Sequence, residues 1–432
     1  MASHRFPPDF LWGTAIAGHQ VEGHNHGSDW WAFELERGLE PSAEGCDFLH
    51  RFEDDLDSAQ ALGTNALRLS LEWSRVEPRP GQRDSDAVGY YHRLTDACLE
   101  RGIQPMLSLV HFTLPRCYAG PKKGWLSEDV HAAFRRHVRW VAEQFGDRVS
   151  TFATVNEPTA QAAAAYVAGV FPPGLRGRFE LAERMELGLL RAHASAYWGL
   201  HERIAQLFPS QRACIGPAQN LVGWRRWRFD PGGILFRRAQ AFNWRFLDAI
   251  HEGLWYGRRC CRLGAWPIPP VSLPELKDSA DFIGINYYTA ADASPLWMGR
   301  VSWLLPPKLG PKTSDMGLPI VPEGFEEVLY EAHLRYRRPI IVTENGIADA
   351  SDRARPEFLR QHLKAMERAM KRGVDVRGYF HWSLLDNFEW HHGYWPRFGL
   401  IEVKRPSLER HPRPSAQIYA ELIRHHQEKT QE

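Results

Sequence analysis

Short apolar runs rich in β-branched residues recur along this chain and alternate with longer stretches of helical periodicity. Consecutive parallel strands cannot be joined by a tight hairpin, so each pair needs a crossover connection that is usually a helix. Eight such strands close into a barrel whose interior is filled by side chains. The alternation therefore predicts the fold class α/β, a single (β/α)8 TIM barrel with long βα loops that form a pocket. The expected strands lie at residues 10–15, 66–71, 104–110, 151–155, 213–217, 281–286, 340–343 and 378–382.

Helical periodicity fills the intervals between these runs, and four irregular stretches interrupt it. We expect the irregular stretches at the carboxyl end of the barrel, where barrels bind their substrates. No linker-like composition divides the chain, and α/β barrels run long as single units, so we expect one domain over residues 1–432. The expected helices lie at residues 52–62, 87–101, 128–144, 181–207, 236–252, 324–335, 357–372 and 414–426, and the irregular stretches at residues 23–46, 169–180, 221–236 and 289–320.

The net charge and the cysteines indicate which classes of binding partner and which cellular compartment to expect. Fifty-three Lys and Arg against 52 Asp and Glu give a formal charge of +1, which indicates neither a nucleic acid nor an anionic membrane as partner. No window approaches the roughly 18 apolar residues of a membrane span, and the first residues lack an apolar signal core. The six cysteines lack zinc-like spacing and are typical of reduced thiols. We expect a cytoplasmic protein, and the sequence gives no oligomeric state.

Two of the apolar runs end in a carboxylate that is followed by a chain-breaking residue. One reads Phe-Ala-Thr-Val-Asn-Glu-Pro and ends around Glu157, and the other reads Pro-Ile-Ile-Val-Thr-Glu-Asn-Gly and ends around Glu344. Taken singly, either glutamate could be a helix-start carboxylate or an ion-pair partner. Two carboxylic acids from separate strands of one barrel are what glycoside hydrolysis needs, since one protonates the leaving oxygen while the other attacks or activates water.

Other polar and aromatic residues gather at the same strand ends. A structural protein has no reason to collect them there, although His111 alone could be a core histidine and Tyr288 alone a packing residue. The set comprises Gln20, Arg68, His111, Asn156, Asn286, Tyr288, Trp382, Glu389 and Trp390.

Five segments, in order along the chain, resemble the family 1 glycoside hydrolases, the β-glucosidase and β-glycosidase family. The resemblance extends from about residue 6 to residue 422 and implies a retaining enzyme on a TIM barrel. The segments are Phe6-Pro-Pro-Asp-Phe-Leu-Trp-Gly-Thr-Ala, Thr154-Val-Asn-Glu-Pro, Phe282-Ile-Gly-Ile-Asn-Tyr-Tyr, Val342-Thr-Glu-Asn-Gly and Trp382-Ser-Leu-Leu-Asp-Asn-Phe-Glu-Trp.

The resemblance also implies roles for the residues around the bond to be cleaved. Glu157 corresponds to the general acid/base and Glu344 to the nucleophile. Asn156 corresponds to the residue that binds the sugar 2-hydroxyl. Arg68, whose positive charge would keep Glu344 ionised, and Tyr288, which would donate to the same carboxylate, match positions beside the nucleophile, and Asn286 is a further supporting residue.

The remaining residues match the family's positions for the glycone, the sugar whose bond is cleaved. Glu389 would accept two sugar hydroxyls, while Gln20, His111 and Trp390 complete the lining and Trp382 forms the floor. Glu389 could instead merely pair with a cation such as Arg397.

The chain departs from the family pattern at the edge of the expected pocket. The usual Trp-Asp-Leu-Pro after the histidine is replaced by Phe112-Thr113-Leu-Pro, and His391 and His392 follow Trp390. The chain is also somewhat shorter than is usual, which suggests a more open entrance for the aglycone. We expect these changes to alter substrate preference more than the reaction.

Neither a metal nor another cofactor is expected. The chain has 20 histidines, and the pairs His24/His26 and His391/His392 are candidate ligands, but no His-Glu-x-x-His spacing, cysteine pair or glycine-rich phosphate cradle accompanies them. The retaining reaction needs none of these groups.

The sequence therefore predicts a retaining, exo-acting β-glycosidase that binds a small β-glycoside or oligosaccharide and cleaves terminal non-reducing β-D-glucosyl residues, with β-galactosyl and β-fucosyl residues as further candidates. Three alternatives stay open. A 6-phospho-β-glycosidase would need the Ser, Lys and Tyr that this branch usually carries after the tryptophan, where this chain reads His391-His-Gly-Tyr-Trp-Pro-Arg. A transglycosylase would use the same two carboxylates. A non-catalytic sugar-binding barrel usually lacks one of them.

Overall fold

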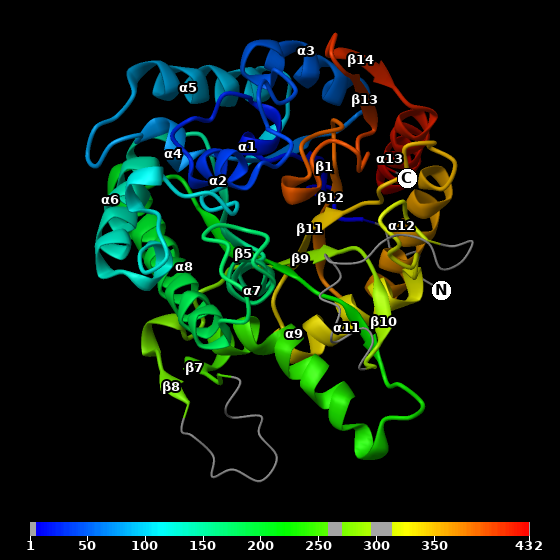
Figure 1. Ribbon diagram of the computed structural model, residues 1–432. Coiled ribbons are helices and arrows are strands. Elements are labelled where there is room, and N and C mark those ends of the chain that lie inside the picture. Colours follow the sequence, from blue (N-terminus) through cyan, green and yellow to red (C-terminus); the bar gives the residue numbers. More distant parts are fainter. Residues whose placement is uncertain (1–5, 258–269, 295–312, 432) are drawn as a thin grey trace.

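The computed structural model describes residues 6–257, 270–294 and 313–431 of the chain (Figure 1). Cys260 and Cys261, together with part of the expected irregular stretch at residues 289–320, lie outside the described residues. Among the described residues, no helix combines the length and the apolar character that a bilayer-spanning segment requires.

Eight parallel strands form a closed barrel, which confirms the predicted fold class. Neighbours in sequence are neighbours in the sheet, and the last strand pairs with the first, for example Leu11 with Gly378 and Ala15 with Trp382. All eight predicted strands are present, with ends that differ by up to three residues. The barrel strands are β1 (Leu11–Ala15), β2 (Ala66–Ser70), β3 (Gln104–Ser108), β4 (Thr151–Asn156), β5 (Cys214–Asn220), β9 (Ile283–Tyr287), β11 (Ile340–Asn345) and β12 (Val376–Trp382).

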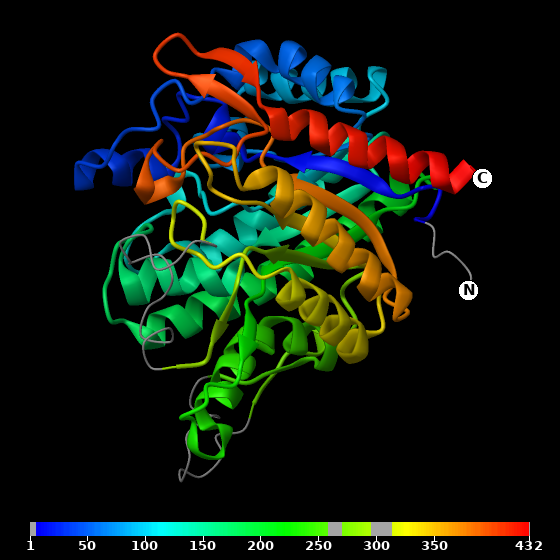
Figure 2. The ribbon, with the colours of Figure 1, turned by 90° about the vertical axis from the view of Figure 1, so that its right-hand side faces the viewer.

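The eight predicted helices are present and surround the barrel (Figures 1 and 2). Polar side chains cap the start of two of them: the Asp84 side chain accepts from the backbone N–H groups of Asp86 and Ala87, and Ser127 accepts from that of Asp129. The helices are α3 (Phe48–Ala61), α5 (Ser85–Glu100), α6 (Glu128–Phe145), α8 (Phe179–Leu207), α9 (Ile234–Glu252), α11 (Pro322–Tyr336), α12 (Arg355–Lys371) and α13 (Pro414–Gln431).

Shorter helices and strands lie in the loops that connect the barrel strands and helices. Three of them lie in stretches that were expected to be irregular, so that expectation is wrong there: helix α2 at residues 23–46, and strands β6 and β10, which pair with each other, at residues 221–236 and 289–320. The helix is short, but Ser28 caps it, Gly38 ends it in the left-handed region, and it buries Trp30 and Phe33. The short elements are α1 (Gly18–Val21), α2 (Asp29–Arg37), α4 (Trp73–Val76), α7 (Pro158–Ala163), β6 (Gly223–Arg225), β7 (Leu254–Trp255), β8 (Val271–Ser272), β10 (Ala290–Asp292), β13 (Ile401–Lys404) and β14 (Glu409–Pro412).

The barrel interior is filled by side chains of unequal size. Phe282, Phe380 and Trp382 pack there against alanines and Met106. Gly13 on β1 makes room for Phe380, because a Cβ at this glycine would overlap the phenyl ring. Large and small residues interdigitate and fill the barrel below the strand ends, so the open space that the barrel offers a ligand lies at its mouth.

Gly346, directly after β11, tests how closely the strand ends are packed. A Cβ at this position would overlap the backbone carbonyl oxygen of Trp382, so Gly346→Ala should destabilise the protein by about 1–3 kcal/mol or more. Gly89, inside α5, is the matched control: its Cβ would meet only the end of the Arg93 side chain at 3.4 Å, and Gly89→Ala should stabilise by up to about 1 kcal/mol. Urea unfolding of both variants measures the difference, and equal effects would contradict the packing described.

Candidate active site

The two glutamates lie at the same end of the barrel and come from two strands, β4 and β11, that are not neighbours in it. Glu344 is the penultimate residue of β11, and Glu157 directly follows β4. Glu157 has a φ of 44°, in the left-handed region, and begins α7 with Pro158 as the first helical residue. Its backbone N–H donates to the Ala218 carbonyl at 2.7 Å, which ties this strained turn to β5.

Arg68 on β2 holds Glu344 and the end of β4 together. Its Nη1 donates to Glu344 Oε1 at 2.5 Å and its Nη2 to Asn156 Oδ1 at 2.6 Å. The Tyr288 hydroxyl donates to the second oxygen, Glu344 Oε2, at 2.6 Å. Both oxygens of Glu344 therefore accept a hydrogen bond, one of them from a guanidinium that is buried to 1% exposure.

Asn286 on β9 connects this cluster to Glu157. Its Nδ2 donates to Glu157 Oε1 at 2.9 Å and to Asn156 Oδ1 at 3.1 Å, while its Oδ1 accepts from the Thr343 hydroxyl at 2.6 Å. These partners fix which end of the Asn286 amide faces the glutamate. A second amide, from Asn220, donates to Glu157 Oε1 at 3.1 Å.

The environment of Glu157 favours its protonated form. Burial is the largest cause and the negative charge of Glu344 the next, and together they raise the pKa of Glu157 to about 7. The hydrogen bonds from Asn286 and Asn220 and the charge of Arg68 oppose this shift. Below pH 7 this carboxylic acid can therefore donate a proton.

Glu389 is a third buried acid in the same group. Burial and the charges of Glu344 and Glu157 raise the pKa of Glu389 to about 8, and Gln20 Nε2 lies 3.5 Å from its Oε2. This raised pKa favours the neutral form of the Glu389 carboxyl group in the unliganded protein. Arg397 contacts Asp386 instead, at 3.5 Å, so the alternative role of Glu389 as its ion-pair partner finds no support.

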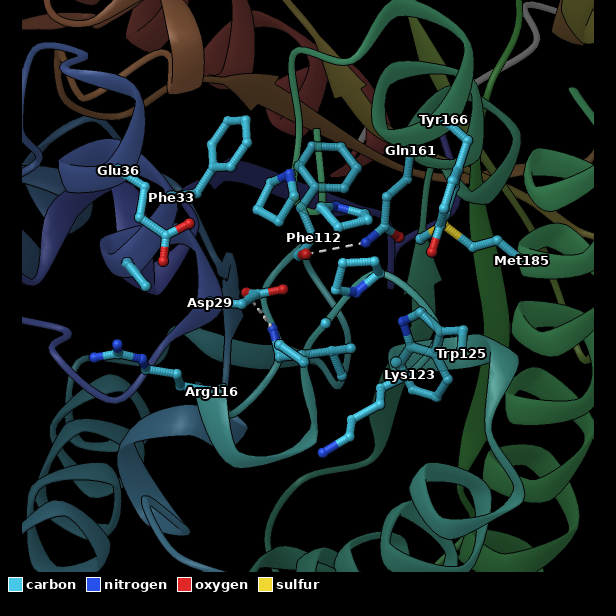
Figure 3. A pocket seen from close by; sticks show the side chains of 18 residues that line it. Asp29, Phe33, Glu36, Phe112, Arg116, Lys123, Trp125, Gln161, Tyr166 and Met185 are labelled. Carbon is cyan, nitrogen blue, oxygen red and sulfur yellow. Dashed lines mark hydrogen bonds between the residues drawn. The ribbon is translucent and has the colours of Figure 1, made fainter. Parts of the chain in front are cut away.

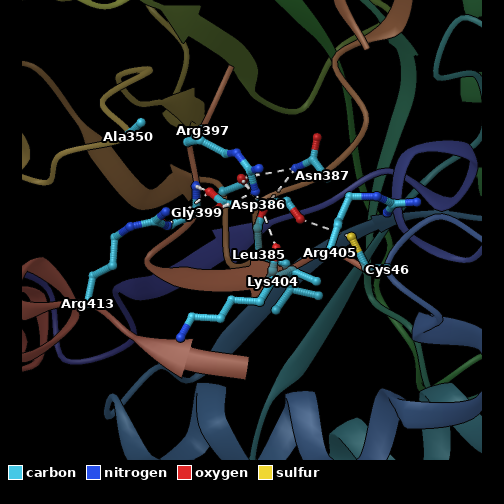
Figure 4. A network of polar contacts seen from close by, with 12 residues as sticks. Cys46, Ala350, Leu385, Asp386, Asn387, Arg397, Gly399, Lys404, Arg405 and Arg413 are labelled. Atoms are coloured by element: carbon cyan, nitrogen blue, oxygen red, sulfur yellow. Dashed lines mark hydrogen bonds and ion pairs between the residues drawn. The ribbon is translucent and has the colours of Figure 1, made fainter. Parts of the chain in front are cut away.

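The loop that carries Glu389 is anchored by Asp386 (Figure 4). Arg413, just before α13, donates to both oxygens of Asp386 at 2.9 and 2.7 Å, and the Gly399 N–H donates to Oδ1 at 2.9 Å. From the other side, Gln20 Nε2 donates to the Phe388 carbonyl at 2.7 Å and to Asn387 Oδ1 at 3.0 Å. The position of Glu389 is thus set by the buried ion pair between Asp386 and Arg413 and by Gln20, which lies beside the Glu389 carboxyl group.

Aromatic rings line the space next to these acids. His111 is nearly parallel to Trp382 and to Trp390, with ring centroids 5.8 and 6.1 Å apart. Burial, followed by the charge of Arg68, keeps the pKa of His111 well below its usual value, so the ring is neutral and its Nε2 accepts from Asn156 Nδ2 at 3.2 Å. Phe112 packs edge-on against Trp390 at 5.1 Å, where the family pattern has an indole.

The structure brings together all the residues that the sequence placed at the strand ends. Hydrogen bonds connect Arg68, Asn156, Glu157, Asn286, Tyr288 and Glu344, and a polar contact joins His111 to Asn156. Gln20 lies against Glu389, and Trp382 and Trp390 flank His111.

Asn220 is the functional neighbour that sequence reasoning missed. The predicted fifth strand ended at residue 217, but β5 continues to Asn220, which therefore also lies at a strand end. The run of Gly, Pro, Ala and Gln before it lacks the β-branched residues that marked the other strands. If the predicted strand had ended at residue 220, Asn220 would have been included among the residues expected at the strand ends.

The histidine pairs considered as metal ligands do not form a metal centre. The rings of His391 and His392 are tilted by 39° with centroids 3.9 Å apart, and the ring centroids of His24 and His26 are 5.7 Å apart. In the described part of the chain, no three His, Cys, Asp or Glu side chains are grouped so that they could hold an ion.

Two carboxyl groups at the mouth of a closed parallel barrel, one of them held by an arginine and the other with a raised pKa, define a barrel glycosidase. The model of glycosyl hydrolase family 1 matches residues 2–428. The chain is 33% identical to coniferin β-glucosidase of Pinus contorta, over 98% of this chain and 92% of the relative.

Solved structures agree with this match. A β-glycosidase from Pyrococcus horikoshii has a TM-score of 0.84 at 35% identity, with 98% of this chain and 96% of the other covered. A β-glucosidase from Thermotoga maritima in complex with glucoimidazole has a TM-score of 0.87 at 30% identity, with 98% and 99% covered. The chain belongs to glycosyl hydrolase family 1. The protein is thus an enzyme, a β-glycosidase that retains the anomeric configuration.

The coupling between the two glutamates can be measured directly. In Glu344→Gln the pKa of Glu157 should fall below 7, because a negative neighbour is lost, yet stay above the usual 4.5, because burial is the larger cause. Carboxyl ¹³C chemical shifts of labelled glutamate against pH give this value. The matched control is Glu421→Gln, at an exposed position of α13, which should leave the titration of Glu157 unchanged. An unchanged titration in Glu344→Gln would contradict the coupling.

Proposed function

We propose that Glu344 is the nucleophile and Glu157 the general acid/base of this β-glycosidase. The observation that carries the proposal is the difference between their environments. Glu344 accepts from Arg68 and Tyr288. Within the described part of the chain, Glu157 accepts from neutral amides alone, and it has a pKa of about 7. Two carboxyl groups with environments that separate their protonation states are the mark of an acid and its partner base.

The reaction follows from these two states. Glu344 attacks the anomeric carbon while Glu157 gives its proton to the departing oxygen, so that a glycosyl ester forms and an alcohol leaves. Ester formation removes the charge of Glu344, which is one of the causes of the raised pKa of Glu157. Glu157 is then a stronger acid, stays ionised, and takes a proton from the water that cleaves the ester.

Asn156 and Arg68 would support the transition state without reacting. Asn156 Oδ1 is occupied by Arg68 and Asn286, and its Nδ2 points to His111, so the amide is held in one orientation next to Glu157. A fixed amide beside the acid suits a hydrogen bond to the sugar 2-hydroxyl, which strengthens as charge develops on the ring.

For the sugar we propose a terminal β-D-glucosyl residue, with β-galactosyl and β-fucosyl residues as further substrates. Gln20, His111, Trp382, Glu389 and Trp390 would line its site. Two of their polar atoms, Gln20 Oε1 and His111 Nδ1, have no hydrogen-bond partner among the described residues, as expected where sugar hydroxyls bind. The names of the β-glucosidases of Pinus contorta and Thermotoga maritima support a glucoside.

Two broader expectations remain predictions. We propose that residues 1–432 act as one domain and that the enzyme works in the cytoplasm. The second point is supported by Cys46, Cys98, Cys117 and Cys214, which are free thiols.

Azide rescue separates the two glutamates by stereochemistry. Glu344→Gly should lose hydrolysis of an aryl β-glucoside, and azide bound in the space left should attack the substrate directly and give the α-glycosyl azide. Glu157→Gly is the matched variant: it still forms the glycosyl ester, so azide attacks that ester from the opposite face and gives the β-glycosyl azide. NMR of the products distinguishes them. The reverse assignment of products, or full activity in Glu344→Gly, would overturn the proposed roles.

Glu389 should read the O4 and O6 hydroxyls of the glycone. Hydroxyls that donate to it favour its ionised form, and each charge-assisted bond contributes about 1.5–3 kcal/mol. Glu389→Ala should therefore reduce kcat/KM for an aryl β-glucoside about 10- to 150-fold more than for an aryl β-fucoside, a 6-deoxy sugar that cannot donate a hydrogen bond from O6. A 6-phospho-β-glucoside should be a very poor substrate of the wild type. Equal losses on glucoside and fucoside would show that Glu389 does not read O6.

A further inference from the structure

A second cavity lies beside the candidate active site, behind the ring of Phe112 (Figure 3). It has a volume of about 290 Å³ and is enclosed by α2, by the loop that follows β3, and by the segment from α7 to Met185. We call it the Phe112 pocket. None of the eleven residues assigned above to catalysis, sugar binding or support lines it. It is therefore distinct from the site of the two glutamates.

Two buried polar groups in the walls of the Phe112 pocket lack a partner. Gln161 is 4% exposed, and its Nε2 donates to the Phe112 carbonyl at 2.9 Å, which fixes the amide and leaves Oε1 without a partner among the described residues. Trp125 is 2% exposed, and its indole N–H likewise has none. In Figure 3 both groups point toward the centre of the pocket. Leaving such groups unsatisfied costs about 1–3 kcal/mol each, so their presence indicates a ligand with matching polar atoms.

The rest of the wall restricts the chemistry of that ligand. Phe33, Phe112 and Tyr166 contribute aromatic rings. Asp29 contributes a carboxyl group whose Oδ1 accepts from the Leu114 N–H at 2.9 Å and whose pKa burial raises to about 7. An apolar molecule would leave Gln161 and Trp125 unpaired. A hydroxyl group both donates and accepts, so it can satisfy an amide oxygen and an indole N–H alike.

Charge and size exclude other polar ligands. The charged lining consists of two acids, Asp29 and Glu36, and two bases, Arg116 and Lys123, so neither a strong anion nor a strong cation is favoured. The volume lies at the small end of ligand pockets, about 300–1,000 Å³, and suits one ring rather than a chain of them.

We propose that the Phe112 pocket is a second binding site, for a single neutral sugar ring such as glucose. Hydroxyls of the ring bind Gln161 Oε1, the Trp125 N–H and the Asp29 carboxyl group, and its apolar face packs on the aromatic wall. Phe112 also contacts His111 and Trp390, with centroids 5.0 and 5.1 Å apart, so one phenyl ring separates this sugar from the candidate glycone site.

Calorimetric titration with glucose tests the proposal while glucoimidazole, at saturating concentration, occupies the catalytic site. The wild type should still bind glucose in a saturable manner. Trp125→Phe, which keeps a ring but removes the N–H, should weaken this binding about 2- to 10-fold. Ala32→Trp, which fills the pocket from a half-buried position of α2, should abolish it. Trp198→Phe is the matched control, because Trp198 is half exposed and not part of the pocket, and it should bind as the wild type does.

Two results would overturn the proposal: no glucose binding by the wild type once glucoimidazole is bound, or equal binding by the wild type, Trp125→Phe and Ala32→Trp. If glucoimidazole itself did not bind, the candidate glycone site would be wrong. The same glucose titrations without it would then still decide the proposal, since only the pocket variants change the Phe112 pocket.

Discussion

The buried guanidinium of Arg68 is the group on which the rest of the site depends. From β2 it donates to Ser108 at the end of β3, to Asn156 at the end of β4, and to Thr343 and Glu344 on β11. A cation buried to this degree is tolerated only when it is paired and its N–H groups are satisfied. Loss of either Arg68 or Glu344 would leave the other as an uncompensated buried charge, at a cost of about 3–5 kcal/mol. The stability of the fold and the chemistry of the site therefore both depend on the ion pair between Arg68 and Glu344.

Three buried acids, Glu157, Glu344 and Glu389, lie at this site, and the single guanidinium of Arg68 does not neutralise them all. Arg68 contacts Glu344 directly, while Glu157 and Glu389 have raised pKa values, each because of burial and of the neighbouring carboxylates. Like charges repel one another in a low dielectric, so the site favours the protonated forms of Glu157 and Glu389, whereas Glu344 is the acid that Arg68 pairs with. This difference separates the proposed nucleophile from the proposed acid. It also leaves Glu389 ready to lose a proton when sugar hydroxyls donate to it.

The barrel and most of the site could be predicted because both follow from short segments. Each strand is a mostly buried apolar run, and the residue that ends it must lie at the barrel mouth, so Glu157 and Glu344 could be placed by their positions. Arg68 lies within β2, and only its long side chain brings it to Glu344. Asn220 was missed because the four residues before it in β5, Gly, Pro, Ala and Gln, include no β-branched residue. The protonation of Glu389 could not be predicted, since it depends on distances between acids from β4, β11 and the loop after β12. The Phe112 pocket could not be predicted from the sequence either, because three segments that are separate in the sequence form its walls.

The central claim is that the sugar becomes covalently bound to Glu344, and trapping that intermediate tests it most directly. An aryl 2-deoxy-2-fluoro-β-D-glucoside with a good leaving group slows both steps, because the fluorine disfavours positive charge on the ring, but the leaving group still departs and the ester accumulates. Peptide mass mapping should find one adduct, on the peptide that contains Glu344. An adduct on the peptide of Glu157 or Glu389, or stoichiometric release of the leaving group with no adduct at all, would contradict the account.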